Sequence, residues 1–273
     1  MILSIFDPHE TSQSKTLANS LGTHVITKLP PNCNQWLEWI RDKKTDTVKL
    51  ALCSSNNGPV SIDFLTGKKA HRRQFGGGKG QPLVKAMGQK NGDDKASLPN
   101  IIDATAGMGG DSFVLASLGF KVTMLERSKI VSALLSDALT RAKNSLNDQP
   151  EEVQQSIHNL SLIQTDSATY LQQAEIKADV IYMDPMYPEK KKKAAAKKEM
   201  QALQTLVGPD LDSSLLLDAA LKTATIRVVV KRPKGAPIVQ SSINNIEPTT
   251  QVSSPNTRYD IYVIKALKAA GKL

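Results

Sequence analysis

Cysteine and histidine are scarce in this chain of 273 residues, which contains only two cysteines and four histidines. Cys33 and Cys53 have no cysteine or histidine neighbours at the spacing of a metal site. We therefore expect no metal centre. Two cysteines in a chain of this length are typical of a protein from a reducing compartment.

Long apolar runs are missing as well. No stretch approaches the ~20 consecutive apolar residues that a membrane-spanning helix needs. The first six residues are apolar, but no basic segment precedes them and the acids Asp7 and Glu10 follow, which argues against a secretory signal. We therefore expect a cytoplasmic protein without a membrane partner.

Acidic residues are outnumbered: 35 lysines and arginines face 26 acids, which gives a formal net charge of +9. The excess favours a polyanionic partner, although it also promotes solubility. Basic residues gather in the stretch 67–90, where Phe75 is followed by three glycines. Basic side chains near an aromatic ring suit a single-stranded nucleic acid, and the alternative is a solvated linker. We predict nucleic-acid contacts at Arg72, Arg73 and Lys79.

Three regions differ in pattern. Residues 1–66 contain short β-like runs and one expected short helix at 35–41, which together predict a small N-terminal α+β lobe. Residues 67–99 form a basic, glycine-rich connector. Residues 100–273 show a regular alternation of strand-like and helix-like segments, which predicts the third and largest domain.

That alternation predicts an α/β fold with a mostly parallel sheet. Strands are expected at 101–105, 121–125, 160–164, 180–183 and 227–231, and helices at 111–118, 130–146, 167–173, 199–206 and 215–221. Two further strand-like runs, 238–246 and 258–266, flank an expected loop at 248–256. They predict an antiparallel hairpin at the end of the sheet.

One predicted strand, 180–183, ends on an acid followed by a proline. Pro185 removes a backbone donor and disfavours a helical conformation at Asp184, so the strand must turn there. Ligands of open α/β sheets bind at the carboxyl ends of the strands. Asp184 and the nearby Tyr187 therefore suit a planar substrate that carries an amine. The alternative is that Asp184 only caps a turn.

A glycine-rich turn follows the first predicted strand of this domain. It contains Gly107, Gly109 and Gly110, with Asp103 and Asp111 at its two ends. Glycines allow a tight turn and close approach of a ligand to the backbone. The dinucleotide-binding fingerprint requires a further glycine where Ser112 stands, and the two acids would repel a pyrophosphate.

Acids also end the next predicted strands. Glu126 can accept hydrogen bonds from ribose hydroxyls, and Asp166 can accept one from an adenine amine. A ring of acids around one crevice favours S-adenosylmethionine, which is cationic, over NAD or ATP. The structural alternative is that Asp111 and Asp166 are helix caps.

With these residues in view, the chain resembles the ribosomal RNA small subunit methyltransferase J family. The resemblance rests on seven blocks in order: AHRRQFGGGKG (Ala70–Gly80), DATAGMGGD (Asp103–Asp111), MLER (Met124–Arg127), YMDPMYP (Tyr182–Pro188), KKEMQALQTLVGPDLD (Lys197–Asp212), VVVKRP (Val228–Pro233) and RYDIY (Arg258–Tyr262). The chain departs from the usual pattern at Gly110, where an arginine is common, and at Tyr187, where phenylalanine is common.

The resemblance implies a Rossmann-like methyltransferase with a seven-stranded sheet. It implies methyl transfer from S-adenosylmethionine, leaving S-adenosylhomocysteine, to the N2 amine of guanosine 1516 in 16S ribosomal RNA, either as RNA or in the small subunit. The implied cofactor contacts are Gly110, Asp111, Glu126, Arg127, Asp166, Ser167 and Asp184.

For the chemistry, we hypothesise that Asp184 and the carbonyl of Pro185 accept the two amine protons while Tyr187 stacks on the base. A basic rim of Lys190, Lys191, Lys192, Lys231 and Arg232 would contact RNA phosphates. A DNA-adenine or protein-glutamine N-methyltransferase and a non-catalytic RNA-binding module remain alternatives. A dehydrogenase is disfavoured by Ser112.

Overall fold

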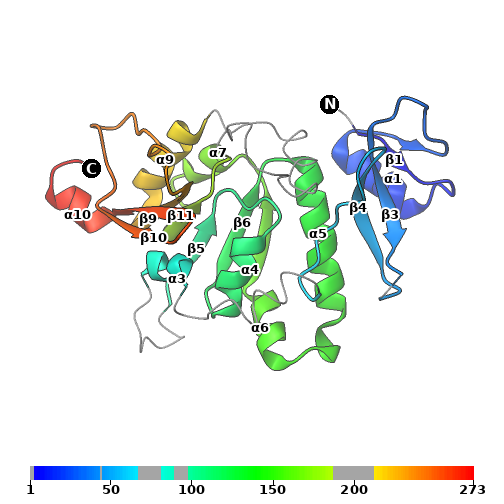
Figure 1. Cartoon of the computed structure of the whole chain (residues 1–273), viewed down its shortest axis with the longest axis horizontal. Helices are drawn as coiled ribbons and strands as arrows, with labels where there is room; N and C mark the ends of the chain where they lie inside the picture. Colours follow the sequence, from blue (N-terminus) through cyan, green and yellow to red (C-terminus); the bar gives the residue numbers. More distant parts are fainter. Residues whose placement is uncertain (1–2, 44, 67–80, 89–97, 187–211) are drawn as a thin grey trace.

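A large sheet with helices on both faces dominates the molecule, and a smaller lobe lies against one of its helices (Figure 1). The computed structural model describes residues 3–43, 45–66, 81–88, 98–186 and 212–273. The expected helix at 199–206 lies outside these ranges, as does most of the basic connector.

The large sheet has the strand order β10-β11-β9-β8-β5-β6-β7. Its strands are β5 (Ile101–Asp103), β6 (Val122–Glu126), β7 (Leu160–Gln164), β8 (Ala178–Met183), β9 (Ala224–Pro233), β10 (Thr250–Ser253) and β11 (Thr257–Val263). Strands β5 to β9 pair in parallel, and β11 is antiparallel to both β9 and β10. The prediction of a mostly parallel seven-stranded sheet with an antiparallel hairpin at its end is confirmed.

Two layers of helices cover the sheet. They are α3 (Pro82–Met87), α4 (Gly110–Ser117), α5 (Lys129–Asn144), α6 (Glu151–His158), α7 (Ser167–Leu171), α9 (Ser213–Thr223) and α10 (Ile264–Ala269), with a short 3-10 turn, η3 (Leu146–Asp148). Side chains alternate across each strand. Ile101 and Val180 therefore join the core of α3, α4, α5 and α6, while Ile102 and Ile181 join the core of α7, α9 and α10.

The helix expected at 130–146 is α5, and local signals in the sequence explain this agreement. Ser128 caps it by accepting a hydrogen bond from the Val131 N–H. Its buried face consists of Val131, Ser132, Leu134, Leu135, Ala138, Leu139 and Ala142, which contains the apolar stripe visible in the sequence. The helix lies between the large sheet and the N-terminal lobe (Figure 1).

The N-terminal lobe is a four-stranded sheet in the order β2-β1-β3-β4. Its elements are β1 (Ile5–Phe6), α1 (Ser12–Leu21), β2 (Val25–Ile26), β3 (Gln35–Arg41) and β4 (Val48–Ser54). Strand β4 packs on α5, and the apolar residues of the lobe belong to the same buried cluster as α4 and α5. Polar contacts reinforce the junction: the Leu50 N–H donates to Asp137 Oδ2 at 3.1 Å, and Arg141 donates to the Ile62 carbonyl at 2.5 Å.

The expected helix at 35–41 is wrong, because these residues form β3. The strand pairs in parallel with β1 and along its whole length in antiparallel fashion with β4. The Trp36 indole N–H donates to Glu38 Oε2 at 2.8 Å. Residues two apart share a face only in a strand, so this contact reports the extended backbone.

The expected strand at 238–246 is also wrong. Asp218 of α9 instead accepts hydrogen bonds from Ser241 Oγ and from the Ser242 backbone, which holds this segment against the helix. The hairpin consists of β10 and β11, and β10 lies in the stretch 248–256 where a loop was expected. A tight return from Ser254 to Thr257 connects it to β11, with N–H to O at 2.7 Å.

Candidate active site

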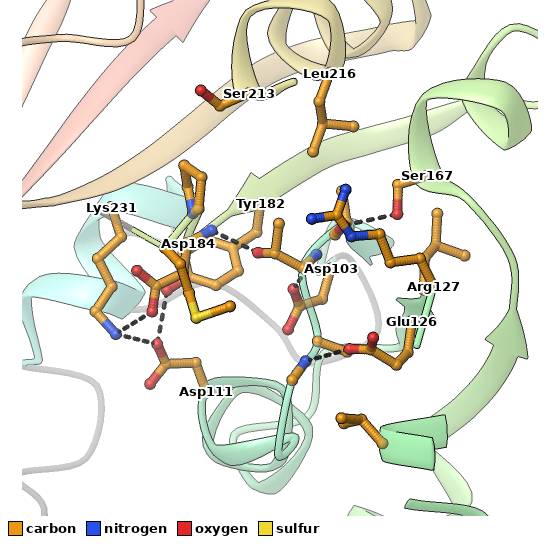
Figure 2. Close-up of a pocket in the computed structure, with 18 of the residues that line it drawn as sticks. Asp103, Asp111, Glu126, Arg127, Ser167, Tyr182, Asp184, Ser213, Leu216 and Lys231 are labelled. Carbon is orange, nitrogen blue, oxygen red and sulfur yellow. Dashed lines mark hydrogen bonds and ion pairs between the residues drawn. The ribbon is translucent and has the colours of Figure 1, made fainter. Parts of the chain in front are cut away.

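A cavity of about 460 Å³ opens at the carboxyl ends of the parallel strands. Residues at the ends of β5, β6, β8 and β9 and just after β5, β6 and β8 line it, together with the first turns of α4, α7 and α9. Figure 2 shows its labelled side chains in two groups, with Lys231, Asp184 and Asp111 on one side and Glu126, Arg127 and Ser167 on the other. The topology thus gathers the predicted residues at one place.

The glycine turn after β5 uses its glycines in two ways. Gly107 and Gly109 both have left-handed backbone conformations, with φ of 52° and 70°. A Cβ at Gly109 would lie 3.0 Å from Leu135 Cδ2 and 3.1 Å from Phe64 Cζ, so this glycine allows close packing against the core. Gly107 and Gly110 line the cavity.

Asp103 holds this turn from inside. Its carboxylate is 2% exposed and accepts hydrogen bonds from Ser112 Oγ at 2.5 Å and from the Thr105 N–H at 3.1 Å. Burial raises the pKa of Asp103 to about 7, and the nearby carboxylates of Asp111 and Asp184 act in the same direction. Ser112 is therefore the hydroxyl partner of this acid.

Glu126 ends β6 and lies next to the glycine turn. Its Oε2 accepts from the Gly107 N–H at 3.0 Å and its Oε1 from the Ser128 N–H at 2.7 Å. Glu126 is thus held by backbone donors on the wall of the cavity.

Asp166 and Ser167 follow β7 and also line the cavity. Asp166 caps α7 by accepting from the Thr169 N–H at 2.9 Å. Ser167 Oγ donates to the Ala104 carbonyl at 2.7 Å, which ties α7 to the end of β5. Asp166 is therefore the helix cap that the structural alternative proposed, and it also lies on the cavity wall.

Arg127 pairs with an acid that the sequence analysis did not select. Its NH1 lies 2.9 Å from Asp212 Oδ2, and both residues line the cavity. This pair joins the end of β6 to the residue preceding α9. Asp212 stands at the end of a block that carried the family resemblance, which was the available signal.

Asp184 emerges from the end of β8, as predicted. Its backbone N–H donates to Thr105 Oγ1 at 2.6 Å, and its Oδ2 accepts from Lys231 Nζ at 2.7 Å. Partial burial raises the pKa of Asp184, Lys231 opposes this rise and Asp111 adds to it. Pro185 follows on the cavity wall.

Lys231 connects Asp184 to Asp111. Its Nζ also lies 2.7 Å from Asp111 Oδ2, the oxygen that accepts from Tyr182 OH at 2.7 Å (Figure 2). Burial acts to lower the pKa of Lys231, but the two carboxylates outweigh it and the net pKa is raised. Burial, together with the nearby acids, raises the pKa of Tyr182, which therefore stays a phenol and a hydrogen-bond donor.

The predicted RNA contacts lie in different places. Lys231 is inside the cavity, and Arg232 is 6% exposed and donates from Nε to the Pro237 carbonyl at 3.0 Å. Six other predicted contact residues and the predicted stacking residue are outside the described ranges: Arg72, Arg73, Lys79, Tyr187, Lys190, Lys191 and Lys192. Lys231 and Arg232 thus make contacts within the protein, and RNA binding by all eight residues stays a prediction.

The chemistry of the cavity suits a positively charged ligand. Among the described residues that line it, the acids are Asp103, Asp111, Glu126, Asp166, Asp184 and Asp212, and the basic residues are Arg127 and Lys231. Backbone atoms of Gly107 and Gly110 are exposed on the same wall. These carboxylates can accept hydrogen bonds from the ammonium and hydroxyl groups of S-adenosylmethionine, and their negative charge suits its sulfonium.

A group of metal ligands and a membrane-spanning helix are both absent from the described ranges. No three His, Cys, Asp or Glu side chains there are grouped so that they could hold a metal ion. No helix in the same ranges is long and apolar enough to cross a membrane.

Comparisons with known proteins point to the same chemistry. Residues 24–264 match the family described as "Putative SAM-dependent methyltransferase". The chain is 61% identical to Ribosomal RNA small subunit methyltransferase J of Hydrogenovibrio crunogenus over 82% of this chain and 77% of the relative. The protein of that name from Aeromonas salmonicida is 42% identical over 98% of this chain and its own full length.

The fold is similar to a solved structure. The crystal structure of a SAM-dependent methyltransferase from Neisseria gonorrhoeae aligns with a TM-score of 0.68 and 29% identity, covering 95% of each chain. The seven-stranded sheet and the cavity at its carboxyl edge are therefore those of a class I methyltransferase.

Proposed function

This chain belongs to the ribosomal RNA small subunit methyltransferase J family, and from that premise we propose that it methylates the exocyclic N2 amine of a guanosine in 16S ribosomal RNA. S-adenosylmethionine is the methyl donor of this family. The target that we propose is guanosine 1516, in the RNA or in the small ribosomal subunit. The observation that supports an amine acceptor best is the Asp184 carboxylate, fixed at the mouth of the cavity.

On the donor side, the residues would hold a cation and a ribose. S-adenosylmethionine supplies a methyl group on a positively charged sulfonium. Glu126 would accept hydrogen bonds from ribose hydroxyls, because backbone N–H groups hold its carboxylate at the cavity wall. Asp166 and the Ser167 backbone would border the adenine, and Arg127 would border the same half of the cavity.

On the acceptor side, the protein must compensate for a weak nucleophile. The lone pair of the guanine N2 amine is delocalised into the ring. Asp184 and the Pro185 carbonyl would accept its two N–H groups, which favours a pyramidal nitrogen whose lone pair is directed away from these acceptors. The amine becomes acidic once methylated, so the Asp184 carboxylate can take the released proton. Orientation supplies the rest of the rate enhancement.

The base must leave its stacked position to reach this site, as it does in other enzymes that modify bases. Tyr187 would then stack on it, an interaction worth about 1–3 kcal/mol per base in single-strand binders. Tyr187 stays a prediction because it lies outside the described residues.

A transfer assay tests the target. The purified protein is given tritiated S-adenosylmethionine with 16S RNA, small subunits from a strain that lacks the enzyme, or DNA. We expect label in the RNA or the subunits, and N2-methylguanosine in the nuclease digest by mass. Label in DNA, or in a different nucleoside, would overturn the proposed target.

The basic residues of the sequence remain a proposed RNA contact. We propose that Arg72, Arg73, Lys79, Lys190, Lys191 and Lys192 bind phosphates next to the cavity. If about five phosphates are neutralised, log affinity falls with log salt with a slope near −3.5 for a single strand. An RNA affinity that does not change with salt would contradict this contact.

A further inference from the structure

We propose that Lys231 is a positioning residue of the methyl transfer, whose ammonium keeps the Asp184 carboxylate ionised and holds it next to Asp111. This role in the reaction rests on the proposed function. Its electrostatic part concerns the protein alone and can be measured without RNA.

The strand register places the three groups together. In the parallel pair of β8 and β9, Met183 lies opposite Val230, so the next residues lie side by side: Asp184 just past the end of β8 and Lys231 still within β9. Tyr182 precedes Asp184 by two residues and therefore lies on the same face of β8. Its hydroxyl reaches Asp111 in the first turn of α4.

The contacts are short and shielded. Lys231 Nζ lies 2.7 Å from Asp184 Oδ2 and 2.7 Å from Asp111 Oδ2. The side chains of Lys231, Asp111 and Asp184 are 25%, 10% and 41% exposed. At this degree of burial, water screens the ion pairs only in part, so the loss of one charge changes the charge state of its partners.

Several charged and titratable groups surround Asp184, and they come from each neighbouring element. They are Asp103 of β5, Asp111 of α4, Tyr182 of β8, and Lys231 and Arg232 of β9. Burial raises the pKa of Asp184, and Asp111 adds to the rise. Lys231 is the strongest opposing influence, with a smaller contribution from Arg232.

The charge state of Asp184 decides what it can do for the amine. An ionised carboxylate only accepts hydrogen bonds, whereas a protonated one carries a donor and has lost an acceptor position. The protonated form also cannot take the proton that the methylated amine releases. Lys231 therefore lowers the pH below which Asp184 is protonated and can no longer accept the amine protons.

The first experiment compares pH–rate profiles of kcat for Lys231→Met, Lys231→Arg and the unchanged protein. Lys222→Met is the matched control, because it removes the same charge from an exposed lysine in the last turn of α9. We expect Lys231→Met to move the acid limb up by about one to three pH units, with an activity loss that shrinks as pH rises. Lys231→Arg should restore most of the profile.

The pattern of loss separates this role from others. A loss in Lys231→Met that is equal at every pH would overturn the inference, since a packing defect acts that way. A rise in the KM for RNA with an unchanged acid limb would also overturn it, because that outcome describes a phosphate contact.

The second experiment measures the carboxyl group directly. Asp184 is titrated by carbon-13 NMR in protein with labelled aspartate and without RNA, and Asp184→Asn assigns its signal. We expect a higher pKa of Asp184 in Lys231→Met than in the unchanged protein or in Lys222→Met. If this shift occurs but no RNA is methylated, only the proposed function fails. If RNA is methylated and the shift is missing, only the inference fails.

Discussion

The two halves of the cavity hold their acids by different means. In the half built after β5, β6 and β7, Asp103, Glu126 and Asp166 accept hydrogen bonds from backbone N–H groups, with the Ser112 hydroxyl as an additional donor. In the half built by α4, β8 and β9, the carboxylates of Asp111 and Asp184 accept from the side chains of Tyr182 and Lys231.

This difference separates what the fold guarantees from what single side chains decide. Backbone N–H groups do not titrate and only a substitution by proline removes one, so the first half keeps its geometry as long as the turn and helices form. The second half depends on one ammonium and one phenol. We therefore expect Glu126 and Asp166, in the half that would hold the methyl donor (the donor half), to tolerate changes of pH, and the half that would hold the amine (the acceptor half) to respond to them. Asp103 is the exception in the donor half, because burial raises its pKa to about 7. Substitutions at four positions test this contrast.

The largest effect is expected in the acceptor half. Asp184→Ala removes the proposed acceptor of the amine protons and should lower kcat by about 10²–10⁴-fold, the range of general acid–base groups. The affinity for S-adenosylhomocysteine, measured by calorimetry, should change by no more than a few fold. Asp179→Ala is the matched control, because Asp179 lies at the opposite end of β8 and bonds Asn100 and Thr225. Normal turnover by Asp184→Ala would end the mechanism.

A smaller effect is expected from Glu126→Gln in the donor half. The amide keeps the shape but offers one acceptor oxygen where the carboxylate offers two, so Gly107 or Ser128 loses its partner. A hydrogen bond to a charged group is worth about 1.5–3 kcal/mol, which corresponds to about 10- to 100-fold in affinity. Calorimetry with S-adenosylhomocysteine measures it, and Glu175→Gln, at an exposed position, is the control. An unchanged affinity would show that Glu126 only supports the turn.

Asp103→Asn tests whether the buried acid of the donor half titrates. The pKa of Asp103 is about 7 in the folded chain, against about 4 when unfolded, so folding favours its protonated form. The sign follows: Asp103 costs nothing below pH 4 and destabilises the fold progressively as pH rises to 7. The substituted protein should therefore gain free energy of unfolding relative to the original over that range. Urea unfolding at several pH values measures this gain, and parallel curves would contradict it.

The smallest effects are expected at Asp166, which both caps α7 and borders the cavity. Asp166→Ala should lose about 1 kcal/mol of stability with its cap. Asp166→Ser keeps a capping oxygen and should leave the melting temperature unchanged, with at most a threefold loss of S-adenosylhomocysteine affinity, roughly 0.7 kcal/mol. A larger loss of affinity in Asp166→Ser would show that the carboxylate, and not the cap, is what the ligand uses.

The order of strands and helices could be predicted because its signals are local. Apolar runs ending on acids marked β5, β6 and β8, and the stripe of α5 was complete. The stretch 35–41 failed because Trp36, Trp39 and Ile40 fit a helical stripe as well as a strand. Only pairing with β1 and β4 decides between the two. Helices α1, α3, α6 and α10 were not predicted. Helix α1 is marked locally by its caps at Thr11 and Gly22, which were overlooked, and the first residues of α10 were expected to continue the strand at 258–266.

The site divided along the same line. The acids at strand ends were visible, because each follows its own apolar run. The place of Lys231 was not, because its contact with Asp184 spans 47 positions and depends on the register between β8 and β9. The burial of Arg232 likewise depends on where the chain returns at Pro237. The spacing of residues along the sequence indicated the class of ligand, whereas the contacts of Lys231 depend on the register between β8 and β9.

Gly109 shows how the N-terminal lobe reaches the chemistry. The ring of Phe64 lies directly beneath this glycine and packs at 5.2 Å, between ring centroids, against Phe113 of α4. Phe64 therefore supports the glycine turn from below, and it is synthesised before the turn because it comes earlier in the chain. A minimal enzyme cut to begin at the large sheet would keep every acid of the cavity and still lack the surface on which its glycines rest.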